Sequence, residues 1–304
     1  MMMRRTKIDS VKVRKSGSDK ALNSIFYLFI AVFAVLCLIP FLVVLGSSFS
    51  SEISLIKEGY CIWPREFSMA SYRMVSEASD IGQAYKVTIF TTVVGTILSM
   101  LFTCSIAYAM SVKKLALRGG IALFIYFTML FNGGLVANYL MITKLLHLKN
   151  SIWVLILPSM VNAYNTLLMR NFFNGIPDSL AESAKIDGAN DIKILFRIIL
   201  PISTPGIATI GLFYALGYWN EWYRVLLYIT EDKLYTLQYL IMKILRQVNY
   251  ASTIPANALQ AGEQIPTYGF RMAAVVVTIG PIIFLYPFLQ KYFVQGLTVG
   301  SVKG

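Results

Sequence analysis

Six long apolar runs constrain this chain more than any other feature of its sequence. They cover residues 22–46, 84–110, 120–141, 152–172, 201–229 and 272–293. A helix needs about 20 mostly apolar residues to cross the hydrocarbon of a bilayer, and bilayers admit only helices and closed barrels. We therefore predict an all-α, polytopic membrane protein with six transmembrane helices. Composition agrees with this prediction, because 57% of the 304 residues are hydrophobic and only 14% are charged.

The fourth and fifth runs carry helix breakers, namely Pro158, Asn162, Asn165 and Pro205. Such residues are tolerated in spans that are buried in protein or that line a cavity. The first run is too long for the apolar part of a signal peptide, and no clear cleavage site follows it. We therefore expect it to persist as the first helix.

Lys and Arg residues are unevenly shared between the two sides of the predicted membrane. The side that holds both termini carries 16 of the 27 basic residues and six of the 15 acidic ones. Connections rich in Lys and Arg stay in the cytoplasm, so both termini and the connection between runs four and five are predicted to be cytoplasmic. The net charge of +12 is explained by this rule and by anionic lipid. The sequence has no basic stripe with interleaved aromatic residues, so nothing in it indicates nucleic-acid binding.

A polar segment at residues 175–200 separates runs four and five. Ser179-x-x-Glu182 has the form of a capping box, and Gly188 can take the left-handed conformation that ends a helix. Asn190 can cap a second short helix that Pro201 stops or kinks. A solvated helix at the membrane surface would give the same pattern, but a docking partner would stabilise a helix this short.

The residues of this segment resemble a known family motif. Glu182-Ser-Ala-x-x-Asp187-Gly188-Ala, followed after nine residues by Ile-Leu-Pro201, resembles the EAA loop of ABC-importer permeases. It is most similar to the MalG-type carbohydrate-uptake permeases. The segments 265–273, 286–293 and 296–304 narrow the resemblance to their LplC/YtcP-like branch. Ser183 departs from the motif, which usually has Ala there.

The resemblance implies a type I ABC importer permease fold with a cytoplasmic coupling helix. Residues 1–20 would form a basic cytoplasmic tail, and 21–304 a single permease domain. Within that domain the coupling loop would span about 175–200 and a C-terminal cytoplasmic tail about 294–304. The residues implied to meet the ATPase from the loop are Ala181, Glu182, Ser183, Ala184, Asp187 and Gly188, and those implied from the tail are Leu297, Thr298 and Lys303.

The resemblance also implies an assembly in which other chains handle ATP. This sequence contains no G-x-x-x-x-G-K-[ST] phosphate-binding loop, so ATP and Mg²⁺ would be bound by two MalK/MsmX-like ATPase subunits. A second homologous permease, an extracytoplasmic solute-binding protein and membrane lipid complete the expected partners. The chain would be a non-catalytic subunit of a bacterial cytoplasmic membrane. No catalytic constellation or metal site is evident, and its three cysteines are scattered.

Oligosaccharide is the expected cargo, from complex or plant polysaccharides. Sugar sites combine aromatic faces with polar edges, and the candidate contacts are Tyr218, Trp219, Asn220, Glu221, Tyr223 and Arg224, with Asn132 and Asn162 in earlier runs. An interfacial aromatic belt and helix–helix hydrogen bonds would explain the same residues. The functional alternatives are a permease for another solute class and a stand-alone secondary transporter. The latter would need intramembrane ionisable residues or an inverted repeat, and neither is clear here.

Overall fold

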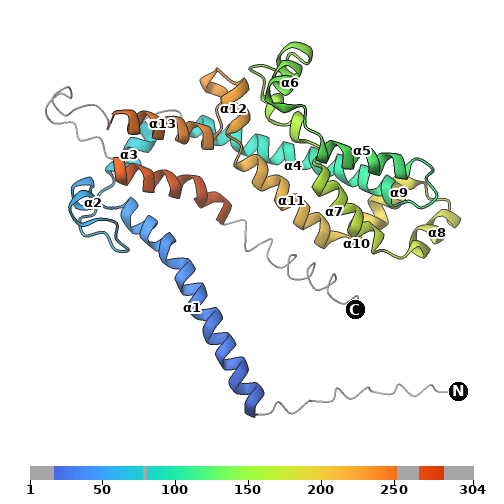
Figure 1. The fold of residues 1–304 in the computed structure, drawn as a ribbon, viewed down its shortest axis with the longest axis horizontal. Coiled ribbons are helices and arrows are strands. Elements are labelled where there is room, and N and C mark those ends of the chain that lie inside the picture. The colour runs from blue at the N-terminus through green and yellow to red at the C-terminus, as the bar shows by residue number, and fades with distance from the viewer. Residues whose placement is uncertain (1–16, 78–80, 252–266, 284–304) are drawn as a thin grey trace.

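The computed structural model describes residues 17–77, 81–251 and 267–283, and within them the chain is built of helices (Figure 1). The described residues contain no strand beyond one isolated bridge between Ser50 and Phe67. This confirms the all-α prediction. Two helices are long and apolar enough to cross a membrane by themselves, namely Leu22–Ser48 within α1 (Gly17–Ser48) and α4 (Ile81–Ser111).

Three further spans consist of two helical pieces bent at a short break. The pieces Arg118–Leu130 and Gly134–Leu145 meet at 114°, Ile152–Ser159 and Ala163–Asn174 at 50°, and Asp191–Ile202 and Thr204–Trp219 at 89°. The described residues thus hold two spans, or up to five if each bent pair counts as one. The sixth apolar run begins in the helix Thr267–Ile283 and continues outside the described residues.

The bent pairs and the connections contain the remaining labelled elements. The α-helices are α2 (Glu52–Glu58), α3 (Ala70–Glu77), α5 (Arg118–Leu130), α6 (Gly134–Leu140), α7 (Ala163–Asn174), α8 (Asp178–Ile186), α9 (Asp191–Ile194), α10 (Leu200–Ile202), α11 (Thr204–Trp219), α12 (Tyr223–Tyr228) and α13 (Leu237–Ala251). Tighter or wider helical turns occupy Met141–Leu145, Ile152–Leu155, Leu157–Ser159, Leu195–Ile199 and Asp232–Leu234.

The third and fifth apolar runs are not single straight helices. In the third, Asn132 Oδ1 accepts a hydrogen bond from the backbone N–H of Gly134 at 2.9 Å, and Gly134 has φ +79°. This turn ends α5 and reverses the chain. In the fifth, α11 ends at Trp219 and α12 starts separately at Tyr223. A hydropathy average does not reveal either break, because most residues on both sides of each are apolar or aromatic.

Pro201 does not itself mark the sharp bend at the start of the fifth run. The helical segment from Asp191 passes through Pro201 and bends at Ser203, two residues later. Pro201 has no N–H to donate, and the preceding turn, Leu195–Ile199, is widened into a π-helix, a form that often accompanies helix kinks. Pro205 then lies in the first turn of α11, where a missing N–H costs little.

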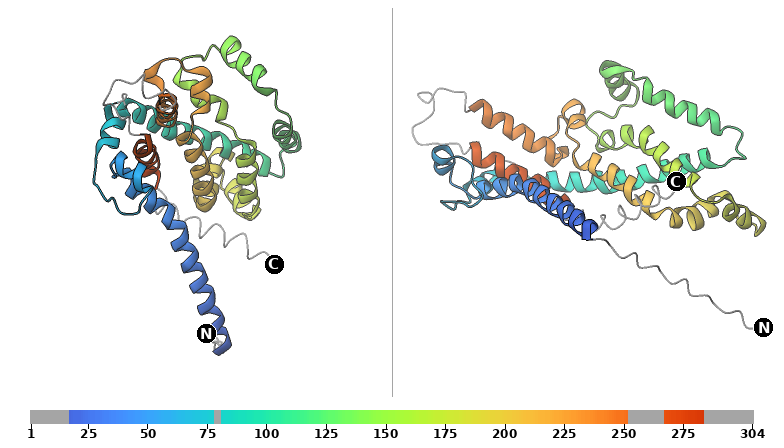
Figure 2. Two further views of the ribbon diagram at one scale, coloured as in Figure 1. Left: turned by 60° about the vertical axis from the view of Figure 1, so that its left-hand side comes forward. Right: turned by 60° about the horizontal axis from the view of Figure 1, so that its bottom comes forward.

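Helix α4 runs through the middle of the molecule, and other spans pack against it. It packs most extensively against α11 and α7, and the two further views show the same arrangement (Figure 2). The face of α4 turned toward these helices is made of small and hydroxyl-bearing residues at three- and four-residue spacing. They are Thr92, Gly95, Ser99, Thr103 and Ala107, all of them buried. Thr88, one turn earlier, instead accepts the backbone N–H of Leu237 at the start of α13.

Two tyrosines of α11 anchor that helix to the small-residue face of α4. Ser99 Oγ lies 2.8 Å from the Tyr218 hydroxyl, and Thr103 Oγ1 lies 2.7 Å from the Tyr214 hydroxyl. Both bonds are buried, so neither tyrosine hydroxyl is left unsatisfied in an apolar environment. Interhelical hydrogen bonds and small residues are the usual means of joining helices in a membrane.

The two ends of this bundle are formed by different helices. At one end lie α8, α9 and α10, which we call the α8 end (Figure 1). At the other lie α2, α3 and α13, together with the start of the helix Thr267–Ile283, and we call this the α3 end. There the Glu52 carboxylate accepts hydrogen bonds from the backbone N–H groups of Thr267, Tyr268 and Gly269 at 2.8–2.9 Å. It thereby caps a helix more than 200 positions away in the chain.

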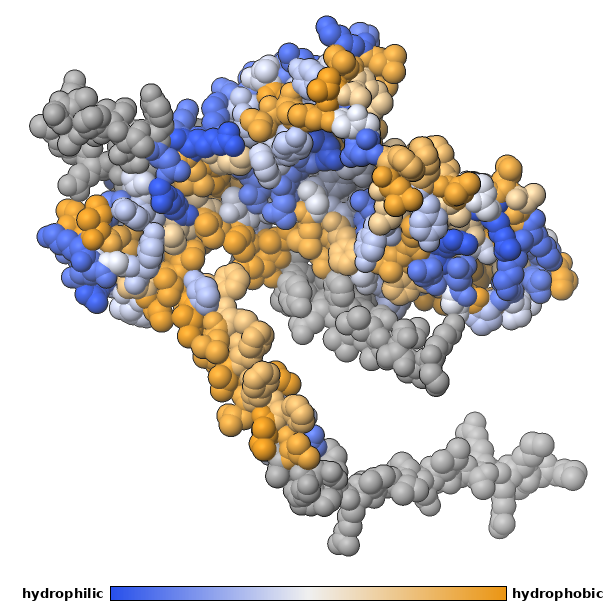
Figure 3. Space-filling view, in the orientation of Figure 1, coloured by the Kyte–Doolittle hydropathy of each residue, from blue (hydrophilic) through white to orange (hydrophobic). Residues whose placement is uncertain are grey.

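Helix α1 leaves the rest of the molecule and stands alone (Figure 1). None of the most hydrophobic stretch of Leu22–Ser48 is buried within this chain. The space-filling view shows apolar side chains over the whole visible length of the helix (Figure 3). An apolar helix of this length needs lipid or another protein around it.

Replacing Gly95 by Ala is expected to destabilise the protein by about 1–3 kcal/mol, the usual cost of overpacking. A Cβ at Gly95 would lie 2.7 Å from the Tyr218 ring, and that ring is held by its hydroxyl. Gly217→Ala is the control, because none of the atoms described lies within 4 Å of a Cβ there. Thermal unfolding of both variants in detergent checks this. Equal melting temperatures would contradict the proposed close contact of α4 and α11.

Candidate functional site

Helix α8 starts at Asp178, directly after Pro177. The predicted capping box is wrong, because Ser179 lies inside the helix and no side chain caps its N-terminus. Pro177 is the N-cap residue, and its ring, which fixes φ, holds the chain extended (φ −60°, ψ 130°). Asp178 in the first turn favours the helix through its charge near the positive end of the helix dipole. The Glu182 carboxylate therefore takes no part in capping α8.

The C-terminus of α8 has the predicted glycine turn. Gly188 has φ +78°. Its N–H donates to the carbonyl of Lys185 at 3.1 Å, and the N–H of Ala189 donates to the carbonyl of Ala184 at 2.9 Å. These two bonds form a Schellman motif, whose left-handed residue is usually glycine. The Asn190 side chain then accepts the N–H of Lys193 at 2.8 Å. The prediction that Asn190 caps the next helix is confirmed.

Helix α8 has an inner and an outer face. Ala181 and Ala184 are partly buried and pack against a cluster that includes Met169, Phe173 and Ile194. Their small size lets α8 lie close to its own bundle. All the other side chains of α8 are exposed, including Glu182, Ser183 and Ile186, and so is Asp187 just after the helix. The exposed fraction of Ile186 is 87%, which is unusual for an isoleucine beside a well-packed core.

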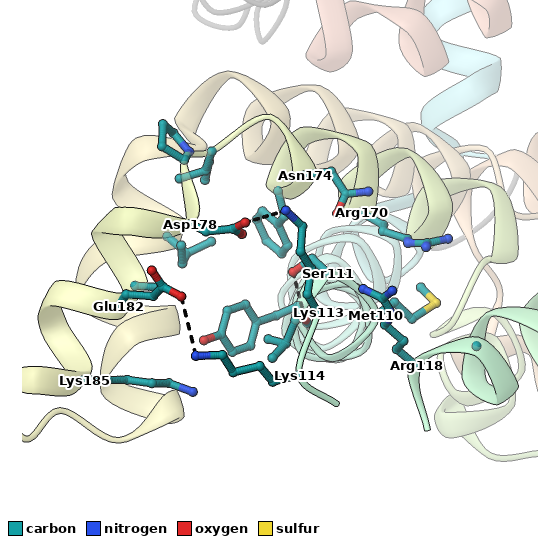
Figure 4. Close-up of a pocket in the computed structure, with 18 residues that line it drawn as sticks. Met110, Ser111, Lys113, Lys114, Arg118, Arg170, Asn174, Asp178, Glu182 and Lys185 are labelled. Carbon is teal, nitrogen blue, oxygen red and sulfur yellow. Dashed lines mark hydrogen bonds and ion pairs between the residues drawn. The ribbon is translucent and has the colours of Figure 1, made fainter. Parts of the chain in front are cut away.

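Ion pairs tie α8 to the neighbouring elements (Figure 4). Lys113, just beyond α4, pairs with Asp178, and Lys114 Nζ lies 3.5 Å from Glu182 Oε1. Lys185 Nζ lies 2.8 Å from Asp191 Oδ1. All these side chains are largely exposed, so each pair contributes at most about 1 kcal/mol. The apolar inner face therefore holds α8, and Glu182 can exchange its partner at little cost.

The candidate sugar contacts divide into buried and accessible residues. Tyr218 and Trp219 are 3% and 5% exposed. The Tyr218 hydroxyl also bonds the carbonyl of Ile156, and Trp219 Nε1 donates to the carbonyl of Thr278 at 3.1 Å. These bonds join α11 to the fourth span and to the helix Thr267–Ile283. Asn220 and Tyr223 lie exposed where α11 gives way to α12.

Glu221 and Arg224 form the ion pair at the break between α11 and α12. Glu221 Oε1 accepts the backbone N–H of Arg224 at 2.9 Å, and its other oxygen accepts the guanidinium. The side chain of Glu221 is 9% exposed and that of Arg224 29%. A largely buried carboxylate needs such partners. The pair fixes the direction of the Arg224 side chain.

Each of the two candidate asparagines in the spans accepts a hydrogen bond from a backbone N–H close to it in the chain. Asn132 Oδ1 accepts from Gly134 N and also from Asn138 Nδ2 at 3.3 Å. Asn162 Oδ1 caps α7 by accepting the N–H of Asn165 at 3.0 Å, while the Asn162 N–H donates to the Tyr214 hydroxyl. Both residues are exposed. Each break in a span is thus satisfied by a local side chain.

A polar recess of about 190 Å³ lies between the broken fourth span and α11. It is lined by Ser159, Asn162, Asn165, Phe213, Tyr214, Gly217, Tyr218 and Arg224. Ser159 Oγ is buried there and has no hydrogen-bond partner among the residues described. Sequence reasoning missed Ser159, although its place directly after Pro158 in a span with helix breakers was a usable signal. The predicted tail residues Leu297, Thr298 and Lys303 lie outside the described residues.

These observations define a class of protein: a polytopic helical membrane protein with broken spans around a central helix and a capped helix at one end. Residues 113–299 match the family of binding-protein-dependent transport system inner membrane components. The chain belongs to that family and has the type I fold of an ABC-importer permease. It is therefore a multi-pass membrane protein that works as a transport subunit.

Similar proteins cover nearly the whole chain. It is 38% identical to the polygalacturonan/rhamnogalacturonan transport system permease protein YtcP of Bacillus subtilis, over 94% of this chain and 99% of that one. It is also 38% identical to protein LplC of the same organism, over 91% and 93%. A crystal structure of a bacterial ABC transporter that imports the acidic polysaccharide alginate matches with a TM-score of 0.76 and 28% identity, over 91% of this chain and 98% of that one.

Neutralising Glu221 is expected to cost about 2 kcal/mol, since hydrogen bonds to charged groups contribute roughly 1.5–3 kcal/mol. Glu221→Gln weakens two bonds and leaves the Arg224 charge partly desolvated. Glu58→Gln is the matched control, because the Glu58–Arg65 pair joins the same residue types with side chains 43% and 63% exposed, and such surface pairs contribute at most about 1 kcal/mol. Thermal melts in detergent compare the two. A larger loss at Glu58 would contradict this view of the α11–α12 break.

Proposed function

We propose that α8 is the coupling helix through which a separate ATPase subunit drives this permease. The observation that carries the proposal is the division of α8 into two faces. Ala181 and Ala184 fix the helix to its bundle, while Glu182, Ser183, Ile186 and Asp187 are exposed. A helix held rigidly on one side and bare on the other can seat in a socket and pass on a rigid-body rotation.

The roles of individual residues follow from this arrangement. Glu182 exchanges Lys114 for a basic residue of the ATPase, which is a small change because their ion pair is exposed and loose. Ile186 supplies apolar contact area in the socket. Gly188 keeps the turn that separates α8 from α9, and Asp187 stands at the outer edge of that turn. The tail residues Leu297, Thr298 and Lys303 are assigned a second contact with the ATPase subunits on the family resemblance alone.

The assembly has further members on the same reasoning. ATP and Mg²⁺ are bound by two ATPase chains at the α8 end, which faces the cytoplasm because the basic residues of the chain gather on that side. A second, homologous permease covers part of α1, whose apolar surface none of this chain buries. A solute-binding protein docks at the α3 end, on the outer side of a bacterial cytoplasmic membrane.

The cargo we propose is an oligosaccharide from plant or other complex polysaccharides, of the acidic, uronate-containing kind. Two proteins similar to this chain are named for polygalacturonan/rhamnogalacturonan and for alginate. The recess beside α11 offers hydroxyl, amide and guanidinium groups from Ser159, Asn162 and Arg224. Such groups suit the hydroxyl and carboxylate oxygens of a sugar acid.

Glu182→Ala is expected to abolish most transport-coupled ATP hydrolysis while leaving the melting temperature unchanged. Lys114→Gln is the matched control, because it removes the same ion pair within the chain but keeps the Glu182 carboxylate for a partner. ATP hydrolysis and ATPase co-purification are measured for both, in vesicles with the binding protein. If the two variants behave alike, the ion pair within the chain is what matters and Glu182 does not contact the ATPase.

Ser159→Ala is expected to raise the KM for oligosaccharide uptake roughly fivefold, since one hydrogen bond contributes about 1 kcal/mol. The melting temperature should not fall, because the Ser159 hydroxyl has no partner in the described residues. Ser105→Ala on α4, whose hydroxyl bonds the carbonyl of Leu101, is the control outside the recess.

The same uptake assay with a panel of uronate and neutral oligosaccharides tests the cargo. We expect uptake of uronate oligosaccharides. Uptake of neutral sugars alone, or of neither kind, would mean that the permease serves a different solute class.

A further inference from the structure

A pocket of about 440 Å³ opens beside α8 and is formed by four elements (Figure 4). Its walls are the end of α4 with the following connection, the start of α5, the end of α7 and the side of α8 that carries Asp178, Ala181, Glu182 and Lys185, and Ile199 adds to the lining. The polar and charged lining residues include Ser111, Lys113, Lys114, Arg118, Arg170, Asn174, Asp178, Glu182 and Lys185. The pocket shares Glu182 with the face of α8 that the coupling proposal uses, whereas Arg118 and Arg170 lie on its other side and take no part in that proposal.

The charges that line this pocket do not balance. Five side chains are basic and two are acidic. Asp178 and Glu182 are matched by Lys113 and Lys114, and Lys185 pairs with Asp191 outside the lining. Arg118 and Arg170 have no carboxylate partner among the residues that the structure describes. Two guanidinium groups therefore remain uncompensated at one side of the pocket.

Of the two arginines, Arg170 gives the stronger evidence for a bound anion. Its Nε is buried and has no hydrogen-bond partner within the described part of the chain. A buried, unsatisfied donor on a charged group is costly, and an arginine cannot shed its charge to relieve that cost. In the close-up, the Arg170 and Arg118 side chains lie on the same side of the α4 end, next to Met110 and away from Asp178 and Glu182 (Figure 4). Such an arrangement fits an anion.

We propose that this pocket binds a phosphate group, and that its source is the headgroup of an anionic phospholipid. Guanidinium groups bind phosphate with paired hydrogen bonds. The pocket lies where one span, α4, ends and the next, α5, begins. Met110, Val112 and Ile176 line it with apolar surface for the glycerol and upper acyl chain. Basic pockets between spans are known to select anionic headgroups.

The test uses the full-length chain, purified with the subunits it retains, in nanodiscs of phosphatidylcholine with increasing phosphatidylglycerol. Melting temperature and lipid retained in native mass spectra are recorded. We expect saturable stabilisation by phosphatidylglycerol, with an apparent affinity roughly fivefold weaker for each arginine removed. The variants are Arg118→Gln, which is exposed and should fold normally, and Arg170→Gln. Arg197→Gln is the control, an exposed arginine at the α8 end that does not line the pocket.

Five outcomes would overturn the proposal. Equal effects of the two lipids would remove the anionic requirement. An unchanged lipid affinity in Arg118→Gln and Arg170→Gln, or an equal loss in Arg197→Gln, would place the lipid elsewhere. Equal stabilisation by millimolar inorganic phosphate would identify free phosphate as the source. If Arg118→Gln weakened ATPase association but had no effect on lipid binding, the pocket would bind a carboxylate of the ATPase and not a lipid. None of these results depends on sugar transport.

Discussion

The contact between α4 and α11 is the interaction on which the rest of this structure depends. A face of α4 made of Gly95, Ser99, Thr103 and Ala107 lets α11 approach closely, and two buried hydroxyl pairs with Tyr218 and Tyr214 hold it there. In a bilayer, hydrophobicity does little to join helices, so close packing and hydrogen bonds must do it. The same two tyrosines also bond the backbone of the broken fourth span, at Ile156 and Asn162. One pair of side chains thus fixes three spans.

The breaks in the spans are where polar chemistry is concentrated. Backbone groups freed at a break need partners inside a membrane. Asn132 and Asn162 supply them from their own side chains, and Glu221 accepts the N–H of Arg224 at the start of α12. Two of these breaks contribute to the polar recess, through Asn162 and through Arg224, the partner of Glu221. The recess therefore exists because helices stop there, and its polar lining is a consequence of how those helix ends are satisfied.

The same scaffold explains how α8 could transmit force. Its inner alanines pack on an apolar cluster that includes Met169 and Phe173 of α7 and Ile194 of the helical segment leading into α11. Movement of α8 would therefore move the elements that line the recess. The exposed ion pairs around α8 add little rigidity, which leaves Glu182 free to change partners. The proposed coupling helix and the recess lie apart, but both adjoin one apolar cluster, which includes Tyr214 and Tyr218.

The sequence by itself determined the apolar runs, the all-α class, the glycine turn at Gly188 and the cap at Asn190. These depend on residues close together in the chain, through hydropathy, φ preference and local hydrogen bonds. The tertiary structure alone decided that Trp219 and Tyr218 join helices and that Ala181 faces inward. It also decided that Ser159 lines a recess and that Glu52 caps a helix beginning at Thr267. The physical reason is that an aromatic or polar side chain in a span can bond cargo, lipid or another helix equally well. Only the position of distant residues selects among these partners.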